Sequence, residues 1–365
     1  MAAPRRFFKV KQKTILVTGG MGFIGKRLMA QLLQQGVGSL IALDNFHPQV
    51  HGADPDKRFD GVVVEEGSVS DELFLQEVLR RHDPDLIFHL AAETGTGQSY
   101  HEISRYCEVN IKGTGHLVEG LRALPSKPRR LVLASSRAVY GEGAYMSETG
   151  ELFVPQPRTS EAMGKGIFGL YDKFGKPAAP VATPEDVPLR PSSIYASTKL
   201  MQEYISVQGL ENTSVQPVIL RFQNVYGPGQ SEKNPYTGVL SIFGQQILQG
   251  LTLNIYEDGE IVRDFVYVDD IVNALILAAT SNGVDGQPIN VGSGVATSIR
   301  YAAECLLAEL GSRSDNLRVS GDFRPGDVRF ALADNKRAQK LLGYEPKVSL
   351  EKGIAAFAQH IKTTR

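Results

Sequence analysis

The sequence has few cysteines, almost no net charge and no long hydrophobic run, and each absence excludes a class of protein. Only two of its 365 residues are cysteines, Cys107 and Cys305, which is too few for a disulfide framework and typical of a reducing compartment. The net charge of −1 leaves no basic footprint for nucleic acid. No apolar stretch approaches the ~20 residues that cross a bilayer. We therefore expect a cytoplasmic protein without nucleic-acid or membrane partners. Neither cysteine has other potential metal ligands near it in the sequence, so we also expect no metal.

The chain does contain enough apolar material for a sizeable core. Its 42% of hydrophobic residues suffice, at this length, for one large α/β unit and a smaller lobe. Its basic segment at residues 5–11 is not followed by the apolar stretch of a signal peptide. We expect residues 1–12 to form a short solvated extension; the alternative, a contact with an anionic surface, stays open.

A short apolar run, a glycine-rich turn and an amphipathic stretch follow one another near the start of the chain. Residues 14–18 (TILVT) indicate a buried strand, residues 19–25 (GGMGFIG) carry the glycines, and residues 26–35 indicate a helix. Glycines permit positive φ and let backbone amides approach an anion at a helix amino terminus. The pattern is typical of a cradle for the pyrophosphate of a dinucleotide. A tight glycine turn without a ligand is the alternative.

An acidic residue ends the next expected strand. Asp44 lies 19 positions beyond Gly25, close to the ~20 residues that separate such a glycine turn from the carboxylate that binds an adenosine ribose. Because a carboxylate repels a 2′-phosphate, Asp44 favours NAD over NADP.

Tyr195 and Lys199 are four residues apart in a segment that we expect to be helical, so both side chains lie on one face. A free tyrosine, with a pKa of about 10, is a poor base at neutral pH, but a nearby cation favours the phenolate. The pair is therefore a candidate for proton transfer at a carbinol. Such spacing is common by chance in helices, and it gains weight from the cofactor pattern.

Expected strands and helices alternate along the first part of the chain. Strands are expected near 14–18, 39–43, 61–65, 85–90, 129–134 and 214–220, and helices near 23–35, 70–81, 104–123 and 194–208. This alternation predicts an α/β fold with a Rossmann-type doubly wound parallel sheet. Further helices near 238–249, 268–280, 298–310 and 335–342, with short strands between them, predict a smaller C-terminal α/β lobe. We expect a dinucleotide-binding domain at 13–223 and a mainly substrate-binding lobe at 224–365, with a soft boundary and a discontinuous second part.

Six segments in one order resemble the extended short-chain dehydrogenase/reductases, and within them the nucleotide-sugar epimerases and dehydratases. The segments are 18–25 (TGGMGFIG), 88–92 (FHLAA), 109–114 (VNIKGT), 134–141 (ASSRAVYG), 220–228 (LRFQNVYGP) and 263–270 (RDFVYVDD). The resemblance covers nearly the whole chain. It implies NAD as cofactor, a nucleotide sugar as substrate, and a homodimer formed through the helices that contain Asn110 and Tyr195.

The resemblance also implies roles for single residues. Tyr195 would take a hydroxyl proton from the sugar, Lys199 would hold the cofactor ribose and lower the tyrosine pKa, and Ser136 would share the hydrogen bond to the same oxygen. The implied cofactor-binding residues are Gly19, Gly22, Phe23, Ile24, Gly25, Asp44, Asn45, Ser68, Val69, Leu90, Ala91, Ala92, Asn110, Tyr195 and Lys199. The implied substrate-binding residues are Thr94, Ser136, Arg137, Asn224, Arg263 and Arg324.

Some of these assignments leave alternatives open. Arg263 and Arg324 suit a diphosphate because a guanidinium matches phosphate oxygens bidentately, but structural ion pairing is the alternative. Arg137 is unusual in the family. Three interpretations of it stay open: a contact with the sugar, a contact with a substrate phosphate, or a surface salt bridge with a carboxylate. Ser68 stands where the family usually has an aspartate near adenine; a serine can still accept a hydrogen bond from the adenine amine.

The residues after Ser136 separate the reactions within the family. The dehydratases carry Asp-Glu where this chain has Arg137 and Ala138, and at the position of Ala138 the decarboxylases carry glutamate and the 3,5-epimerases cysteine. Lys233, where a 3,5-epimerase carries an acidic-proton partner, is then expected to be a solvated loop lysine. The simplest remaining reaction is oxidation, rotation of the keto-sugar and return of hydride, which is NAD-dependent 4-epimerisation of a nucleotide sugar.

Segments 92–99, 234–238 and 255–259 resemble a branch of the family that acts on dTDP-6-deoxysugars such as dTDP-L-rhamnose. Two other functions stay open: an NAD(P)H-dependent nucleotide keto-sugar reductase, and a non-catalytic dinucleotide-sensing protein on the same fold. The connection at about 142–191 is longer than the family usually has and rich in turn formers. A cover over the sugar or a contact with a partner subunit, and a tolerated surface insertion, are equally open interpretations of it.

Overall fold

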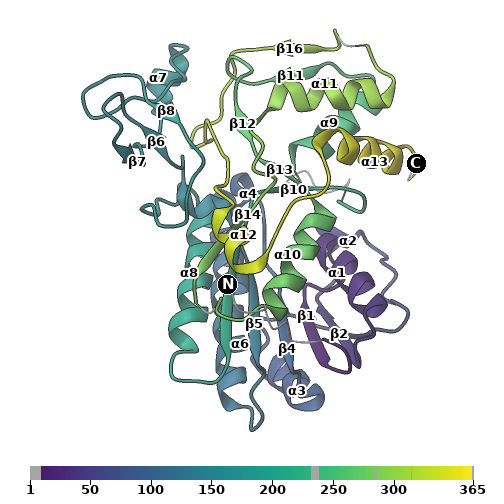
Figure 1. Cartoon of the computed structure of the whole chain (residues 1–365). Coiled ribbons are helices and arrows are strands. Elements are labelled where there is room, and N and C mark those ends of the chain that lie inside the picture. Colours follow the sequence, from purple (N-terminus) through teal and green to yellow (C-terminus); the bar gives the residue numbers. More distant parts are fainter. Residues whose placement is uncertain (1–9, 232–237, 285, 314, 364–365) are drawn as a thin grey trace.

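The computed structural model in Figure 1 describes residues 10–231, 238–284, 286–313 and 315–363. Most of the expected tail at 1–12, Lys233 and residues 234–237 therefore lie outside the described residues. A seven-stranded sheet with the order β14-β9-β5-β4-β1-β2-β3 forms the centre, and all of its neighbours pair in parallel. The chain winds outward from β1 in both directions, so the predicted doubly wound α/β fold is confirmed.

Six of the seven strands lie within two residues of their predicted positions. Their bounds are Thr14–Thr18 (β1), Ser39–Asp44 (β2), Val63–Glu66 (β3), Leu86–His89 (β4), Arg130–Ser136 (β5) and Gln216–Phe222 (β9). The seventh, β14 (Pro288–Val291), comes from the part of the chain that was expected to build the second lobe. A run of four residues is too short to show a strand period, and its pairing with β9 decides its place.

Helices cover both faces of this sheet, because alternate strand residues point to opposite sides. On one face Ile15 and Val17 pack with α1 (Phe23–Gln34) and α10 (Val268–Thr280). On the other face Leu16 packs with α3 (Glu72–His82) and α6 (Gly113–Ala123), and α8 (Ile194–Gly209) lies beside α6. Each of these helices begins near the carboxyl ends of the strands and ends near their amino ends.

The helix predicted at 104–123 is interrupted. The structure has α4 (Thr96–His101), α5 (Ile103–Tyr106), a π-helical turn η1 (Cys107–Lys112) and then α6. Asn110 lies in the π turn, and its buried side chain bonds to residues outside the helix. Such turns are frequent at functional sites.

The second lobe, at the top of Figure 1, forms its own apolar core. Its helices are α9 (Val239–Leu248), α11 (Ile299–Leu310) and α13 (Leu350–Thr363), and α12 (Lys336–Leu342) lies close to β14. Its short strands are β10 (Asn224–Tyr226), β11 (Leu253–Ile255), β12 (Val262–Arg263), β13 (Phe265–Tyr267), β15 (Thr297–Ser298) and β16 (Leu317–Val319). Helix α13 was not predicted.

The long connection after β5 folds into a small unit of its own. It contains strands β6 (Tyr145–Met146), β7 (Leu152–Phe153) and β8 (Ala179–Pro180), which form one sheet, and helix α7 (Ser160–Gly164). Arg158, whose side chain is 2% exposed, forms ion pairs with Glu142 at 3.2 Å and with Glu257 of the second lobe at 2.8 Å. These buried contacts fix the connection against the second lobe.

The described residues contain neither a candidate membrane span nor a candidate metal cluster. No helix among them is both long and apolar enough to span a membrane. Within the same ranges, no group of three or more His, Cys, Asp or Glu side chains is placed to hold a metal ion.

Candidate active site

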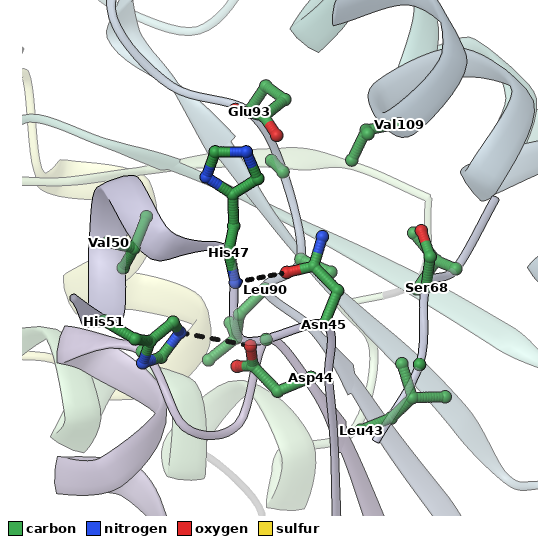
Figure 2. Close-up of a pocket in the computed structure, with 16 residues that line it drawn as sticks. Leu43, Asp44, Asn45, His47, Val50, His51, Ser68, Leu90, Glu93 and Val109 are labelled. Carbon is green, nitrogen blue, oxygen red and sulfur yellow. Dashed lines mark hydrogen bonds and ion pairs between the residues drawn. The ribbon is translucent and has the colours of Figure 1, made fainter. Parts of the chain in front are cut away.

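A groove at the carboxyl ends of β1, β2 and β4 brings together most of the expected cofactor residues (Figure 2). Nine of them line it: Gly19, Gly22, Asp44, Asn45, Ser68, Val69, Leu90, Ala91 and Ala92. The sequence analysis missed the other lining residues, Leu43, His47, Val50, His51, Gly67, Glu93 and Val109. Several of these are next to a predicted residue in the sequence, and that position was the only sequence signal that they line the groove.

The glycine turn at one wall of the groove is closed tightly enough to require glycine. A Cβ at Gly25 would lie 2.4 Å from the carbonyl oxygens of Gly19 and Gly20, and a Cβ at Gly19 (φ +68°) would lie 2.8 Å from the amide nitrogen of Ala91. The turn leads into the amino terminus of α1, where unpaired amides and the helix dipole favour an anion. These residues therefore fit the pyrophosphate of a dinucleotide.

Asp44 is held at the other wall of the groove. Its oxygens accept hydrogen bonds from the amides of Met21 and Phe46, each at 3.0 Å, and Nε2 of His51 lies 3.1 Å from Oδ1 (Figure 2). A carboxylate offers about four lone-pair sites, so Asp44 can still accept from ribose hydroxyls. His51 comes from the short helix α2 (Pro48–His51), which had no signal in the sequence.

Six of the fifteen expected cofactor residues do not line this groove: Phe23, Ile24, Gly25, Asn110, Tyr195 and Lys199. Phe23 and Ile24 pack against the apolar cores. Asn110 is fully buried: its Oδ1 accepts from the amide of Glu93 at 2.7 Å, and its Nδ2 donates to Thr198 Oγ1 at 2.9 Å. Asn110 therefore ties the wall at Glu93 to helix α8, which carries Tyr195.

Ser136 and Tyr195 meet where β5 ends and α8 begins. Helix α8 is capped by Ser193, whose Oγ accepts from the amide of Ala196 at 3.1 Å, and this cap fixes the first turn that contains Tyr195. Burial raises the pKa of the Tyr195 phenol, and a hydrogen bond with the Ser136 side chain opposes that rise. The two hydroxyls can therefore share a proton at one substrate oxygen.

Lys199 lies one turn further along α8, and its buried ammonium donates to Oε1 of Gln202 at 2.5 Å. Burial lowers the pKa of Lys199 to about 7, against a smaller opposing effect of the Glu203 carboxylate. The expectation that Lys199 lowers the pKa of Tyr195 stays a prediction: in this structure burial raises that pKa, and the Lys199 ammonium is bonded to Gln202 in the next turn of its own helix.

A second pocket lies on the side of α8 that faces the second lobe. Its walls bring together Arg137 and Arg324, although the two are far apart in the sequence. The other lining residues are Thr96, Gly97, Ser99, Tyr100, His101, Ala138, Ser192, Ser193, Ile194, Pro325, Gly326, Asp327 and Val328. Segment 90–101 therefore contributes to both the groove and this pocket. Of the pocket residues that the sequence missed, Ser193 could have been found as the helix cap two residues before Tyr195.

Arg263 does not line this pocket, and its partner differs from those of Arg137 and Arg324. Arg263 forms an ion pair of 2.7 Å with Asp327, whereas Arg137 donates to the carbonyl of Gly141 at 2.5 Å and Arg324 lies over the ring of Tyr256 at 4.9 Å. Within the described ranges, neither Arg137 nor Arg324 has a carboxylate partner. Burial and the nearby Arg263 guanidinium lower the pKa of Arg137 to about 10. Close cations with few anions favour an anionic ligand here.

Four expected substrate residues lie outside the walls of this pocket: Thr94, Ser136, Asn224 and Arg263. Thr94 is exposed, and its carbonyl accepts from the hydroxyl of Tyr106 at 2.5 Å. Asn224 begins β10, and its amide donates to the carbonyl of Asp264 at 3.0 Å. Neither position is explained by a contact of its side chain in this structure.

Comparison with known proteins gives consistent matches along the chain. The profile of the NAD dependent epimerase/dehydratase family matches residues 15–162 and 170–292. The sequence is 37% identical over 347 residues to dTDP-L-rhamnose 4-epimerase from Burkholderia thailandensis, covering 94% of each chain. It is 32% identical over 359 residues to UDP-glucose 4-epimerase from Mycolicibacterium smegmatis, covering 95% of this chain and 98% of the relative.

The fold is similar to a solved structure with ligands bound. The crystal structure of UDP-glucuronic acid 4-epimerase from Bacillus cereus, in complex with UDP-glucuronic acid and NAD, has a TM-score of 0.77 at 27% identity and covers 96% of this chain and 100% of that chain. The profile match over most of the chain, the near full-length relatives and the glycine cradle facing Asp44 lead to one conclusion: this chain belongs to the NAD-dependent epimerase/dehydratase family.

Proposed function

We propose that this protein is an NAD-dependent nucleotide-sugar 4-epimerase whose substrate is a dTDP-linked 6-deoxyhexose. One observation carries the reaction type: the hydrogen-bonded pair of Ser136 and Tyr195 adjoins the arginine pocket, which their chain neighbours Arg137 and Ile194 line, and the two residues after Ser136 are Arg137 and Ala138. Neither of the latter two is an acid or base for elimination or decarboxylation. The relatives named as 4-epimerases support the reaction, and the B. thailandensis relative supports the sugar.

The chemistry follows from these positions. Bound NAD supplies a hydride acceptor and donor at C4 of the sugar. Tyr195, as phenolate, takes the proton of the C4 hydroxyl, while Ser136 donates a hydrogen bond to the same oxygen. The keto-sugar rotates within the pocket and presents its opposite face. Tyr195 then returns its proton to the C4 oxygen as the hydride is returned to C4. Proton and hydride are both restored, so no external reductant is consumed.

The arginine pocket supports a nucleotide diphosphate as the anchor of the substrate. Arg137 approaches from the end of β5 and Arg324 from the second lobe, so an anion between them is held by both parts of the molecule. A guanidinium can bind two phosphate oxygens at once. Held by its diphosphate, the sugar remains free to rotate, as inversion at C4 requires.

We also propose a homodimer and a cytoplasmic location. Met201, Tyr204 and Val207 are exposed on one stripe of α8, and a groove between α6 and α8 lies beside it. A second copy that covers this stripe would bury apolar surface on the helices that carry Asn110 and Tyr195. Both cysteines are free thiols, as a reducing compartment keeps them.

The test is to incubate the purified protein with a panel of dTDP-, UDP-, GDP- and CDP-sugars without added cofactor. Products are followed by NMR and NADH by its absorbance. Formation of a C4 isomer of a dTDP-6-deoxyhexose at constant NADH absorbance is the expected result. Turnover only with added NADH or NADPH would instead identify a keto-sugar reductase. NAD binding without any turnover would favour a sensing protein.

A further inference from the structure

The two walls of the dinucleotide groove are joined by a reciprocal pair of glutamine side chains. Nε2 of Gln49, in α2, donates to Oε1 of Gln98 at 2.7 Å, and Nε2 of Gln98, in α4, donates to Oε1 of Gln49 at 2.9 Å. Neighbours of Gln49 line one side of the groove, and the segment that leads into α4 lines the other. The pair therefore links the segments that form the two sides of the groove, next to its lining residues.

Gln98 is the better anchored member of the pair. It is 3% exposed, and its Nε2 also donates to Glu102 Oε1 at 2.7 Å. Arg105 donates to Glu102 at 2.6 Å and to Glu93 at 2.6 Å. Because Glu93 lines the groove, these bonds connect Gln98 to the wall of the groove. The pKa of Arg105 is raised by these carboxylates, so it stays charged.

Gln49 belongs to a segment with little support of its own. Helix α2 has only four residues and lies in the connection 45–62 between β2 and β3, flanked by Phe46 (φ +48°) and Gly52 (φ +84°). A helix this short gains little from its own hydrogen bonds. Figure 2 shows that this segment carries His47 and His51 over the groove beside Asp44. The pair of amides links this segment to the far wall.

We propose that Gln49 and Gln98 form a clasp that closes the groove over NAD and slows its release between catalytic cycles. The need for retention rests on the proposed function, because an epimerase must return the same hydride to the same sugar. The clasp itself does not depend on which sugar is used.

The experiment measures release of NAD without any sugar present. Wild type, Gln49→Ala and Gln98→Ala are loaded with NADH, mixed with excess NAD, and followed by the loss of bound NADH fluorescence. We expect release to be about tenfold faster in each variant, which corresponds to about 1.4 kcal/mol. The double variant should be no faster than the single ones, because both substitutions remove one interaction.

Two further variants keep the result specific. Gln76→Ala, at a half-buried position of α3 whose side chain donates to Glu72 Oε1 at 3.0 Å, is the matched control and should release NADH at the wild-type rate. Gln49→Glu combined with Gln98→Lys places the lysine between the new carboxylate and Glu102 and should restore slow release.

Unchanged release in both alanine variants would overturn the proposal, as would faster release in Gln98→Ala alone, which would point to Glu102 instead. A wild-type protein that does not retain NADH would also overturn it. A protein that retains NADH but turns over no nucleotide sugar would overturn the proposed function and leave the clasp intact.

Discussion

The ammonium of Lys199 donates to the side-chain oxygen of Gln202 at 2.5 Å, in the interior of the protein. The amide nitrogen of Gln202 in turn donates to Thr114 Oγ1 at 2.7 Å, so the amide group is oriented with its oxygen toward the lysine. A buried amine with one neutral partner is poorly compensated, and burial holds its pKa near 7.

This lysine should make stability depend on pH. Its pKa in the folded protein, about 7, lies below the ordinary value of 10.5, so between these values the unfolded chain binds more protons. The stability of the cofactor-free protein relative to Lys199→Met should therefore rise with pH from 7 to 10.5, by up to about 1.4 kcal/mol per pH unit. Urea unfolding at several pH values measures this. The exposed Lys352→Met serves as control, and a difference that does not change with pH would contradict the prediction.

Two neighbouring serines of β5 should behave differently. Ser136 bonds to Tyr195, whereas Ser135 donates to the buried carboxylate of Glu203 at 2.5 Å. We expect Ser136→Ala and Tyr195→Phe to lower kcat about 10²- to 10⁴-fold, with NAD still bound. Ser135→Ala should lower stability while kcat stays within a few-fold. Steady-state kinetics and cofactor release on denaturation report both effects, and equal losses of kcat for the two serines would refute the assignment.

Arg137 should act on substrate affinity. If it binds a phosphate oxygen, Arg137→Ala should raise KM by about ten- to a hundredfold with little change in kcat, because the bond is present in both ground and transition states. Arg137→Lys keeps the charge but not the bidentate fork and should fall between the two. Arg58→Ala, at a highly exposed position, is the control. A loss confined to kcat would place Arg137 at the reacting carbon instead.

The buried ion pair between Glu203 and Arg221 should be sensitive to removal of one partner. Two contacts of 2.7 and 2.9 Å join the side chains, which are 7% and 3% exposed. Glu203→Ala leaves the guanidinium buried without its counter-charge, and we expect a loss of about 3–5 kcal/mol in the free energy of unfolding. Glu151→Ala, which breaks an exposed pair with Lys173, should have little effect. Chemical denaturation measures both, and similar losses would contradict this prediction.

A charge on the exposed stripe of α8 should disrupt the proposed dimer. Tyr204→Glu introduces a carboxylate that would have to be desolvated in the interface, so we expect monomers at concentrations where wild type is dimeric. Analytical ultracentrifugation gives the mass. Leu251→Glu, at an exposed apolar position of the second lobe, should leave the mass unchanged. A monomeric wild type would exclude the dimer altogether.

Local patterns in the sequence were sufficient for much of the fold. The glycine turn, the strand that ends at Asp44 and the strands and helices of the first 223 residues depend on interactions between near neighbours, which leave a period or a turn signal. The resemblance to the extended short-chain dehydrogenase/reductases is confirmed by the family profile and the relatives. The pairing of Ser136 with Tyr195 followed from that resemblance and not from any local pattern.

Tertiary structure alone decided the remaining features. Packing against β9 made a four-residue run the seventh strand, a buried arginine fixed the long connection to the second lobe, and folding brought Arg137 beside Arg324 and Gln49 beside Gln98. Each of these contacts joins residues far apart in the chain. The sequence by itself determined which short segments become helix, strand or turn, because those choices are made by neighbours; which side chains meet across the groove was decided only when distant segments packed together.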